Sequence, residues 1–227
     1  MWNEGGPRAL RVDAAAGRPF FALGEDGLMA ASRLAGDGTP RHGVLDHAQG
    51  LAAVEGHDGM PGGAVAFDGT TSELRYALPW FPQEDYSFTA WVRADDVVSG
   101  GFQQVFSAWC RGGDDPLRVT VEKGEISARI EAATGYVRTP GVALEAGKWV
   151  HVAAVKSGGT LTLYLDGNPA GNTGAARRVV SDSLHVGVGF NPMLPGGERF
   201  RGAVQDFAFH AQALSAAQVR AARDGAR

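Results

Sequence analysis

The segment at residues 160–171, TLTLYLDGNPAG, constrains the fold of this chain more than any other. Its leucines occupy every second position from Leu161 to Leu165, and side chains two residues apart lie on the same face of a β-strand. The run ends on Asp166-Gly167, a pair that tolerates the positive φ angles of a two-residue hairpin turn. The segment is therefore predicted to form a strand, a tight turn and a second strand.

Similar patterns extend over most of the chain. A β-rich run covers residues 149–155, and a second hairpin is predicted to turn at Lys123-Gly124. From residue 63 onward, strand-like segments recur at roughly ten-residue spacing, which is typical of an all-β antiparallel sandwich or barrel. The segments are AVAFDG, ELRYAL, YSFTAWVRA, QQVFSAW, LRVTVEKGEISARI, GYVRTP, SLHVGVG and FRGAVQDFAFH.

Other expectations concern the two ends of the chain. Within residues 1–26, ALRVDA and RPFFAL are each compatible with a short strand, so this region is an extension, a linker or an edge strand. Residues 35–62 are expected to be mostly ordered loop with short extended pieces. A helix is predicted in LSAAQVRAARDG, with Ser215 and Gln218 forming a capping box, and is expected to cover a sheet edge or the bottom of the core.

Composition excludes several classes of protein. The chain has 227 residues, 44% of them hydrophobic, and a net charge of −4 without a clustered Lys/Arg stripe, which argues against nucleic acid as a partner. With Cys110 as the single cysteine, neither an intramolecular disulfide nor a cysteine-based zinc site can form. No apolar run is long enough to span a membrane, and the first residues lack the features of a signal peptide.

Five segments in order, AVAFDG, YSFTAWVRADD, GKWVHVAAV, LTLYLDGNPAG and FRGAVQDFAFHAQALSAAQV, resemble the laminin-G-like, concanavalin A-like jelly-roll domains of bacterial secreted and surface proteins. The resemblance covers residues 27–227, with residues 27–35 in place of the usual opening strand. It implies a two-sheet antiparallel β-sandwich with loops at the rim. It also implies binding of glycans or proteins, and an extracellular or periplasmic location in a larger parent protein. Activity inferred from a fold alone is analogy.

The resemblance further implies one structural calcium ion. Many relatives hold it with a backbone carbonyl near the FDG turn and an Asp in the last strand. Asp68-Gly69 matches the first part, whereas Gln205 stands at the usual Asp position and Asp206 takes the second acidic place. A neutral amide oxygen weakens the expected affinity, so the sequence leaves open whether calcium binds.

Catalytic patterns are weak. Glycoside hydrolases of the resembling superfamily carry Glu-x-Asp-x-x-Glu, which places two acids on one strand face, and this chain lacks that string. Glu122 and Glu125 flank a hairpin turn and are interpreted as solvated charges, while Glu131 ends the next strand. No Gly-x-Ser-x-Gly elbow is present, and Cys110 has no histidine near it in sequence. These observations favour a protein that is not an enzyme.

Histidines form a loose group near the start of the chain. His42, His47 and His57 lie within a short stretch that also holds Asp46 and Asp58. Imidazole and carboxylate groups together are able to hold zinc, but this spacing fits no tight motif, and loop histidines are usually solvated or hydrogen-bonded. We therefore assign no metal to this group.

Aromatic residues in loops are the best candidates for ligand contacts, because sugars stack their C–H faces on aromatic rings. Trp80 and Phe81 lie between two prolines, and the alternative for both is a place at the end of the core. The full set of candidate ligand-binding residues is Trp80, Phe81, Trp109, Arg111, Asp114 and Tyr136.

The sequence thus predicts a non-catalytic recognition module with carbohydrate as its ligand. Two alternatives stay open: a protein–protein interaction or structural domain that uses the same surface, and an atypical carbohydrate-active enzyme.

Overall fold

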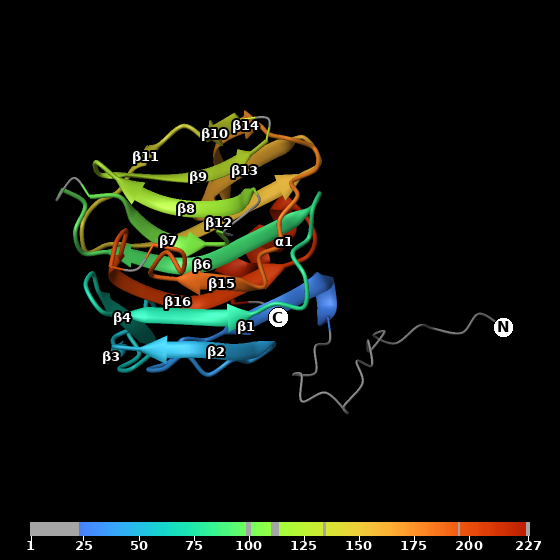
Figure 1. Cartoon of the computed structure of the whole chain (residues 1–227). Helices are drawn as coiled ribbons and strands as arrows, with labels where there is room; N and C mark the ends of the chain where they lie inside the picture. The colour runs from blue at the N-terminus through green and yellow to red at the C-terminus, as the bar shows by residue number, and fades with distance from the viewer. Residues whose placement is uncertain (1–22, 99–100, 110–113, 134, 195, 226–227) are drawn as a thin grey trace, which may run out of the picture.

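The computed structural model describes residues 23–98, 101–109, 114–133, 135–194 and 196–225. These residues form two antiparallel β-sheets of eight strands each, packed face to face, and one α-helix (Figure 1). The predicted all-β sandwich is confirmed. The expected strand ALRVDA lies outside the described residues, as does RPFFAL except for Leu23.

One sheet, here called the back sheet, has the strand order β14-β13-β12-β6-β16-β4-β3, with β1 also paired to β16. Its longest strands are β6, β12 and β16, which pair side by side at its centre. The strands are β1 (Leu28–Ser32), β3 (Ala52–Val54), β4 (Ala64–Asp68), β6 (Tyr86–Ala94), β12 (Trp149–Ser157), β13 (Thr160–Leu165), β14 (Asn168–Gly174) and β16 (Arg201–His210).

The other sheet, the front sheet, has the order β10-β9-β8-β7-β15-β5-β2, with β11 also paired to β9. Two short strands, β2 in this sheet and β3 in the back sheet, are the extended pieces of the segment 35–62. The strands are β2 (Val44–Gln49), β5 (Glu73–Ala77), β7 (Gln103–Ser107), β8 (Asp115–Glu122), β9 (Glu125–Ala132), β10 (Gly135–Arg138), β11 (Val142–Ala143) and β15 (His185–Val188).

Both hairpin turns lie where the sequence places them. Asp166 and Gly167 have φ angles of 48° and 77°, and Lys123 and Gly124 have 52° and 81°. Positive φ at both central residues gives the turn a twist that matches the twist of the flanking strands. The alternating leucines of β13 point into the core, where Leu161 and Leu163 are fully buried.

The core between the sheets is largely aromatic. Phe106 of the front sheet lies 4.6 Å from Phe88 and 5.6 Å from Phe209 of the back sheet, measured between ring centroids. Such offset and tilted ring pairs add about 0.5–1.5 kcal/mol each beyond their buried area. Phe207 joins the same group and stacks on Tyr76 of the front sheet.

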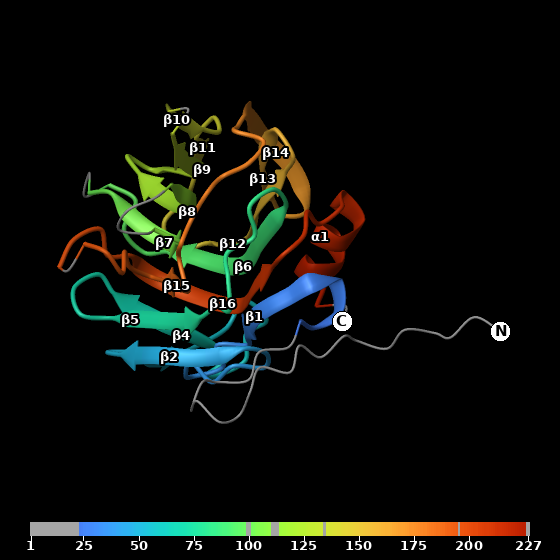
Figure 2. The same cartoon turned by 45° about the vertical axis from the view of Figure 1, so that its right-hand side comes forward.

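Helix α1 (Ala216–Arg223) begins with the predicted capping box of Ser215 and Gln218. Its Val219 packs with Leu214 against Ala153 and Val155, so the helix covers the outer face of the back sheet rather than a sheet edge (Figure 2). A short 3-10 turn, η2 (Glu25–Gly27), precedes β1. Within the described part of the chain, neither helical segment has the length and apolar character that crossing a membrane requires.

Candidate functional site

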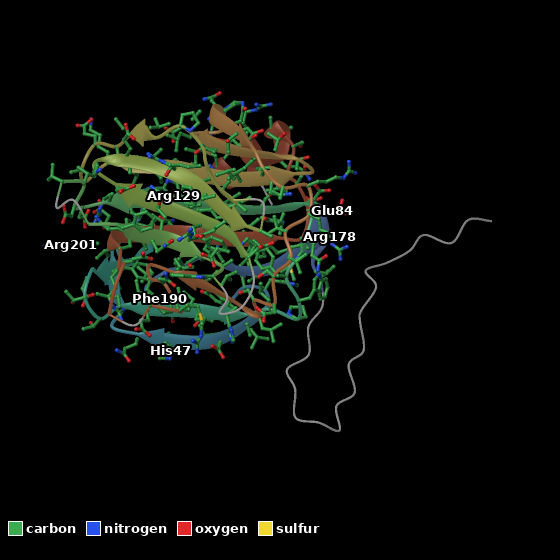
Figure 3. All side chains as sticks on the ribbon, turned by 45° about the horizontal axis from the view of Figure 1, so that its top comes forward. His47, Glu84, Arg129, Arg178, Phe190 and Arg201 are labelled. Atoms are coloured by element: carbon green, nitrogen blue, oxygen red, sulfur yellow. The ribbon has the colours of Figure 1, made fainter. Side chains whose placement is uncertain are left out.

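The outer side of the front sheet, here called the front face, is strongly polar. Its central row follows the strand register from Arg138 on β10 through Arg129 on β9 and Arg118 on β8 to Ser107 on β7. The residues between these positions along β8 and β9 point inward and are buried apolar side chains. Strand alternation therefore places three arginines side by side on one face, of which Figure 3 labels Arg129.

Each of these arginines forms an ion pair with a glutamate on the adjacent strand. Arg118 Nη2 lies 3.1 Å from Glu131 Oε2 and 3.7 Å from Asp115 Oδ2. Arg129 Nη2 donates to Glu122 at 2.6 Å, and Arg138 Nη2 to Glu125 at 3.0 Å. The charges at the Lys123-Gly124 hairpin are thus ion-paired, which corrects the expectation that they are simply solvated.

Arg129 is held on several sides at once. Its guanidinium donates to Tyr136 Oη at 2.6 Å as well as to Glu122, and it lies 4.4 Å from the ring centroid of Phe102. The hydrogen bond from Arg129, opposed by desolvation, keeps the pKa of Glu122 below its ordinary value. Only 5% of Arg129 is exposed, so this cluster is a rigid support rather than a mobile surface group.

Arg118 lies between two aromatic rings that reach the surface. The centre of its guanidinium is 5.6 Å from the Trp109 ring and 6.0 Å from the Tyr136 ring. Arg118 Nε is buried and has no hydrogen-bond partner among the described residues. We call Trp109, Arg118 and Tyr136 the aromatic platform. It brings aromatic rings and charged groups together at the surface, and sugar-binding surfaces combine these two features.

A loop after β15 closes the middle of the front face. A Cβ at Gly187 would lie 3.1 Å from both the carbonyl oxygen of Phe190 and a ring carbon of Pro192, so the loop packs closely on β15 at this glycine. Glu198 accepts hydrogen bonds from Gln104 at 2.8 Å and Asn191 at 2.7 Å, which fixes the loop. Figure 3 shows Phe190 between Arg129 and His47.

The far part of the front face carries its own ion pairs. Arg75 pairs with Asp46, and Arg199 pairs with Glu73 at 2.5 Å. His47 also lies 3.3 Å from Glu73. These contacts join β2, β5 and the segment before β16.

The predicted residue Asp114 lies near the platform but has a structural role there. Its Oδ1 accepts the backbone N–H of Ala133 and its Oδ2 that of Val180, each at 2.8 Å. Asp114 thereby joins the start of β8 to two other loops. Arg111, which the sequence places in the same loop, lies outside the described residues.

Trp80 and Phe81 have different environments. Phe81 is 4% exposed and packs against Tyr86 and Phe209, so it belongs to the core and we leave it out of the site. Trp80 is 39% exposed. It lines a hollow of about 500 Å³ at the strand ends near Glu84 and Arg178, which Figure 3 labels. The lining residues are Pro79, Trp80, Phe81, Pro82, Gln83, Ser181, Asp182 and Leu184.

The four residues expected to hold calcium do not meet at one point. Asp68 is paired with Arg201 in the register of β4 and β16, and Gln205 is four residues further on, about 13 Å away along the strand. Asp68 Oδ1 accepts backbone N–H groups of Thr70, Thr71 and Ser72 at 2.7–3.0 Å and therefore stabilises its own turn with Gly69. These hydrogen bonds, and one from the Thr71 hydroxyl, lower the pKa of Asp68 although desolvation opposes them.

Gln205 and Asp206 lie elsewhere on the back sheet. Gln205 Oε1 accepts the backbone N–H of His57 at 2.8 Å, and the register of β16 against β6 shifts between Gln205 and Ala208. Asp206 at this bulge has a φ angle of 52° and lines a separate hollow of about 260 Å³ beside α1. No three His, Cys, Asp or Glu side chains of the described residues gather as metal ligands would.

The histidines predicted to be a loose group are dispersed. His42 approaches Gly24, His47 lies on the front face, and His57 stacks on Trp91 of the back sheet.

Reasoning from the sequence missed the arginines of the front face. The signal was present in LRVTVEKGEISARIE, where Arg118, Glu122, Glu125, Arg129 and Glu131 all fall on the polar side of two strands. Read as a two-stranded surface, this segment predicts cross-strand ion pairs. The pairing of β9 with β10, which brings Tyr136 and Arg138 next to these residues, is visible only in the tertiary structure.

Comparison with known structures agrees with this architecture. A botulinum neurotoxin type C structure, described as dependent for cell entry upon interaction with two ganglioside molecules, has a TM-score of 0.69 at 9% identity over 89% of this chain and 52% of that chain. The binding domain of botulinum neurotoxin DC in complex with SialylT has a TM-score of 0.70 at 10% identity over 91% of this chain and 53% of that chain. This chain spans about half of each, and at such identity the likeness shows the fold alone.

Sequence comparison defines the family. No curated protein matches this chain. The Laminin_G_3 family, described as the concanavalin A-like lectin/glucanases superfamily, matches residues 64–220, which is more than half of the chain and includes β4 to β16. The five ordered segments of the sequence and the two packed eight-stranded sheets agree with that match. This chain therefore belongs to the concanavalin A-like lectin/glucanases superfamily.

Proposed function

We propose that this chain is a non-catalytic carbohydrate-recognition module that binds glycans on the aromatic platform of Trp109, Arg118 and Tyr136. The observation that carries the proposal is the position of the Arg118 guanidinium between the rings of Trp109 and Tyr136, both of which reach the surface. A sugar ring stacks on an aromatic face while its hydroxyls bond to Arg118 and the neighbouring carboxylates. The neurotoxin structures named with gangliosides and SialylT support this ligand class by analogy of fold.

The front face offers little to a hydrolase mechanism. A retaining or inverting glycosidase needs one carboxyl group with a raised pKa as general acid and a second carboxylate nearby. Here Glu122 has a lowered pKa because of its bond to Arg129, and Glu125 and Glu131 are tied to Arg138 and Arg118. These pairs support a binding role over a catalytic one.

Affinity electrophoresis through gels that contain soluble polysaccharides tests the proposal. Retardation by at least one polysaccharide, reduced tenfold or more in both Trp109→Ala and Tyr136→Ala, is the expected result. Met60→Ala is the control. Met60 is 59% exposed, and its loop packs on the back sheet through His57, whereas the platform is on the front face. Binding that survives both platform substitutions would place the site elsewhere.

A protein partner is the second candidate function, and a specific patch favours it. Trp80, Val180 and Leu184 are 39%, 56% and 51% exposed at one end of the sandwich, beside the hollow of about 500 Å³. Clustered exposed apolar side chains are frequent at protein interfaces. Self-association seen by light scattering, and lost in Trp80→Ala, together with a silent glycan screen would support this candidate instead.

Two further points belong to this proposal. An extracellular or periplasmic location in a larger secreted or surface protein rests on the family. A structural calcium ion, which the family resemblance implies with Gln205 at the usual Asp position, also remains part of the proposal.

A further inference from the structure

The arginines of the front face, taken alone, suggest an affinity for negatively charged glycans. Arg118, Arg129 and Arg138 are adjacent in the strand register. Guanidinium groups bind carboxylates and sulfates strongly when their donors are available. Whether this row attracts anions therefore depends on what the carboxylates beside it do.

In all three pairs the carboxylate is the more exposed member. The side chains of Arg118 and Glu131 are 8% and 58% exposed, and those of Arg129 and Glu122 are 6% and 28% exposed. For Arg138 and Glu125 the values are 33% and 47%. A ligand that approaches the front face thus meets carboxylate oxygens first, with the positive charges beneath them.

Carboxylates at the surface accept hydrogen bonds from sugar hydroxyls and repel other anions. Two like charges about 4 Å apart in water repel enough to weaken binding about fivefold, and more where water is partly excluded. Since each described arginine of this row already has a carboxylate partner, a ligand carboxylate would have to displace that partner before it gains its own ion pair. The arrangement favours hydroxyl groups over acidic ones.

We propose that the front face selects uncharged glycans and rejects glycans with carboxylate or sulfate groups, with Glu131 as the specificity-determining residue at the aromatic platform. This inference rests on the proposed carbohydrate-binding function. We assign this role to Glu131 because it pairs with Arg118, the arginine that lies between Trp109 and Tyr136. It is also the most exposed of the three acids, so Glu131→Gln removes a negative charge from the surface beside Arg118 and leaves Asp115 as the remaining carboxylate partner of this arginine.

The experiment compares neutral polysaccharides with their own charged derivatives. Affinity electrophoresis compares gels that contain hydroxyethyl cellulose with gels that contain carboxymethyl cellulose. It also compares gels that contain dextran or laminarin with gels that contain their sulfated forms. The wild-type protein is expected to be retarded at least fivefold more by a neutral parent than by its charged derivative. If a charged derivative retards the wild-type protein as much as its neutral parent does, or more, the inference is overturned.

Glu131→Gln provides a gain-of-function arm. The variant is expected to bind the sulfated or carboxymethylated polysaccharides at least fivefold more strongly than wild type at low salt, and to lose this gain at about 0.5 M NaCl, where screening is strong. Glu145→Gln is the matched control, because Glu145 is 68% exposed in an ion pair with Lys148 outside the front face. No gain in Glu131→Gln overturns the inference.

The two failures can be told apart. If no neutral parent retards the wild type, the proposed carbohydrate function fails. The Glu131→Gln arm reads a different property, because it needs only the loss of the negative charge beside Arg118 and an anionic polymer. Equal melting temperatures of both variants and the wild type confirm that the comparison concerns the surface charge alone.

Discussion

The imidazole of His57 lies stacked on the indole of Trp91, with ring centroids 4.0 Å apart and 12° between the planes. The contact docks the loop before β4 onto the outer face of the back sheet. His151 approaches the same indole edge-on at 5.5 Å, and its Nδ1 is buried without a hydrogen-bond partner among the described residues. Trp91 thus contacts two histidines, of which His57 is half-buried and His151 is buried.

Acidification should destabilise the protein through His151. Desolvation, with smaller effects of Arg223 and His57 and an opposing effect of Asp224, lowers the pKa of His151 to about 4. The unfolded chain takes up this proton near pH 6.5 and the folded chain only near pH 4, so the free energy of unfolding should fall by up to about 3 kcal/mol as the pH drops between these values.

Urea unfolding at several pH values checks this dependence. His151→Leu should reduce the slope of the pH profile in this range, because one buried titrating group is gone. Part of the slope should remain, because desolvation also lowers the pKa values of His210 and His185. His47→Gln, at a histidine whose side chain is 36% exposed on the front face, should keep the wild-type slope. An unchanged slope in His151→Leu would contradict the assignment.

Lys156 should be required for stability. It is fully buried, and its ammonium donates to three backbone carbonyls, those of Glu84, Gly158 and Arg177. Lys156→Met leaves these acceptors unpaired and should lower the free energy of unfolding by about 2–3 kcal/mol. Lys148→Met, at a side chain 67% exposed, should change it by less than about 0.5 kcal/mol. Equal effects of the two substitutions would argue against this role.

Tyr136 should separate ring stacking from hydrogen bonding in glycan binding. Tyr136→Phe removes the hydroxyl that accepts from Arg129 but keeps the ring beside Arg118. We expect it to retain binding within about threefold, and Tyr136→Ala to reduce it about tenfold, since a stacking contact of about 1.4 kcal/mol corresponds to a factor of ten in affinity. Affinity electrophoresis measures both. Equal losses would mean that the hydroxyl, not the ring face, contacts the sugar.

Gly189 should tolerate no side chain. It has a φ angle of 79°, and an added Cβ would lie 2.1 Å from a ring carbon of Phe67 in the core. Gly189→Ala should therefore cost more than about 2 kcal/mol of unfolding free energy. Gly196 is a matched control, with a φ angle of 78° and nothing within 4 Å of an added Cβ, so Gly196→Ala should cost about 1 kcal/mol from backbone strain alone.

Calcium, as proposed, should raise the melting temperature relative to EDTA. Gln205→Ala should remove the difference, because Gln205 stands at the position where many relatives supply an Asp ligand. Asp68→Ala should keep it, since Asp68 lies at another part of β4 and stabilises its own turn. The same melting temperature in calcium and EDTA would remove the ion from the proposal.

Local patterns were enough to predict the sandwich and most of its strands. The period-two leucines of β13, the Asp166-Gly167 turn and the Ser215–Gln218 capping box depend on residues close in sequence, and each is confirmed. Phe81 shows the limit of this reasoning. Its proline-flanked position resembles that of Trp80, yet only the packing of Tyr86 and Phe209 around it makes it a core residue.

The sequence by itself determined the fold class and the polar character of one sheet face, because strand periodicity and turn chemistry act over a few residues. Only the tertiary structure decided which groups meet. Pairing of β8, β9 and β10 aligned Arg118, Arg129 and Arg138, and loop packing placed Trp109 and Tyr136 on either side of Arg118. The same packing separated Asp68 from Gln205. Register and loop closure depend on contacts between residues far apart in sequence, and no local pattern specifies them.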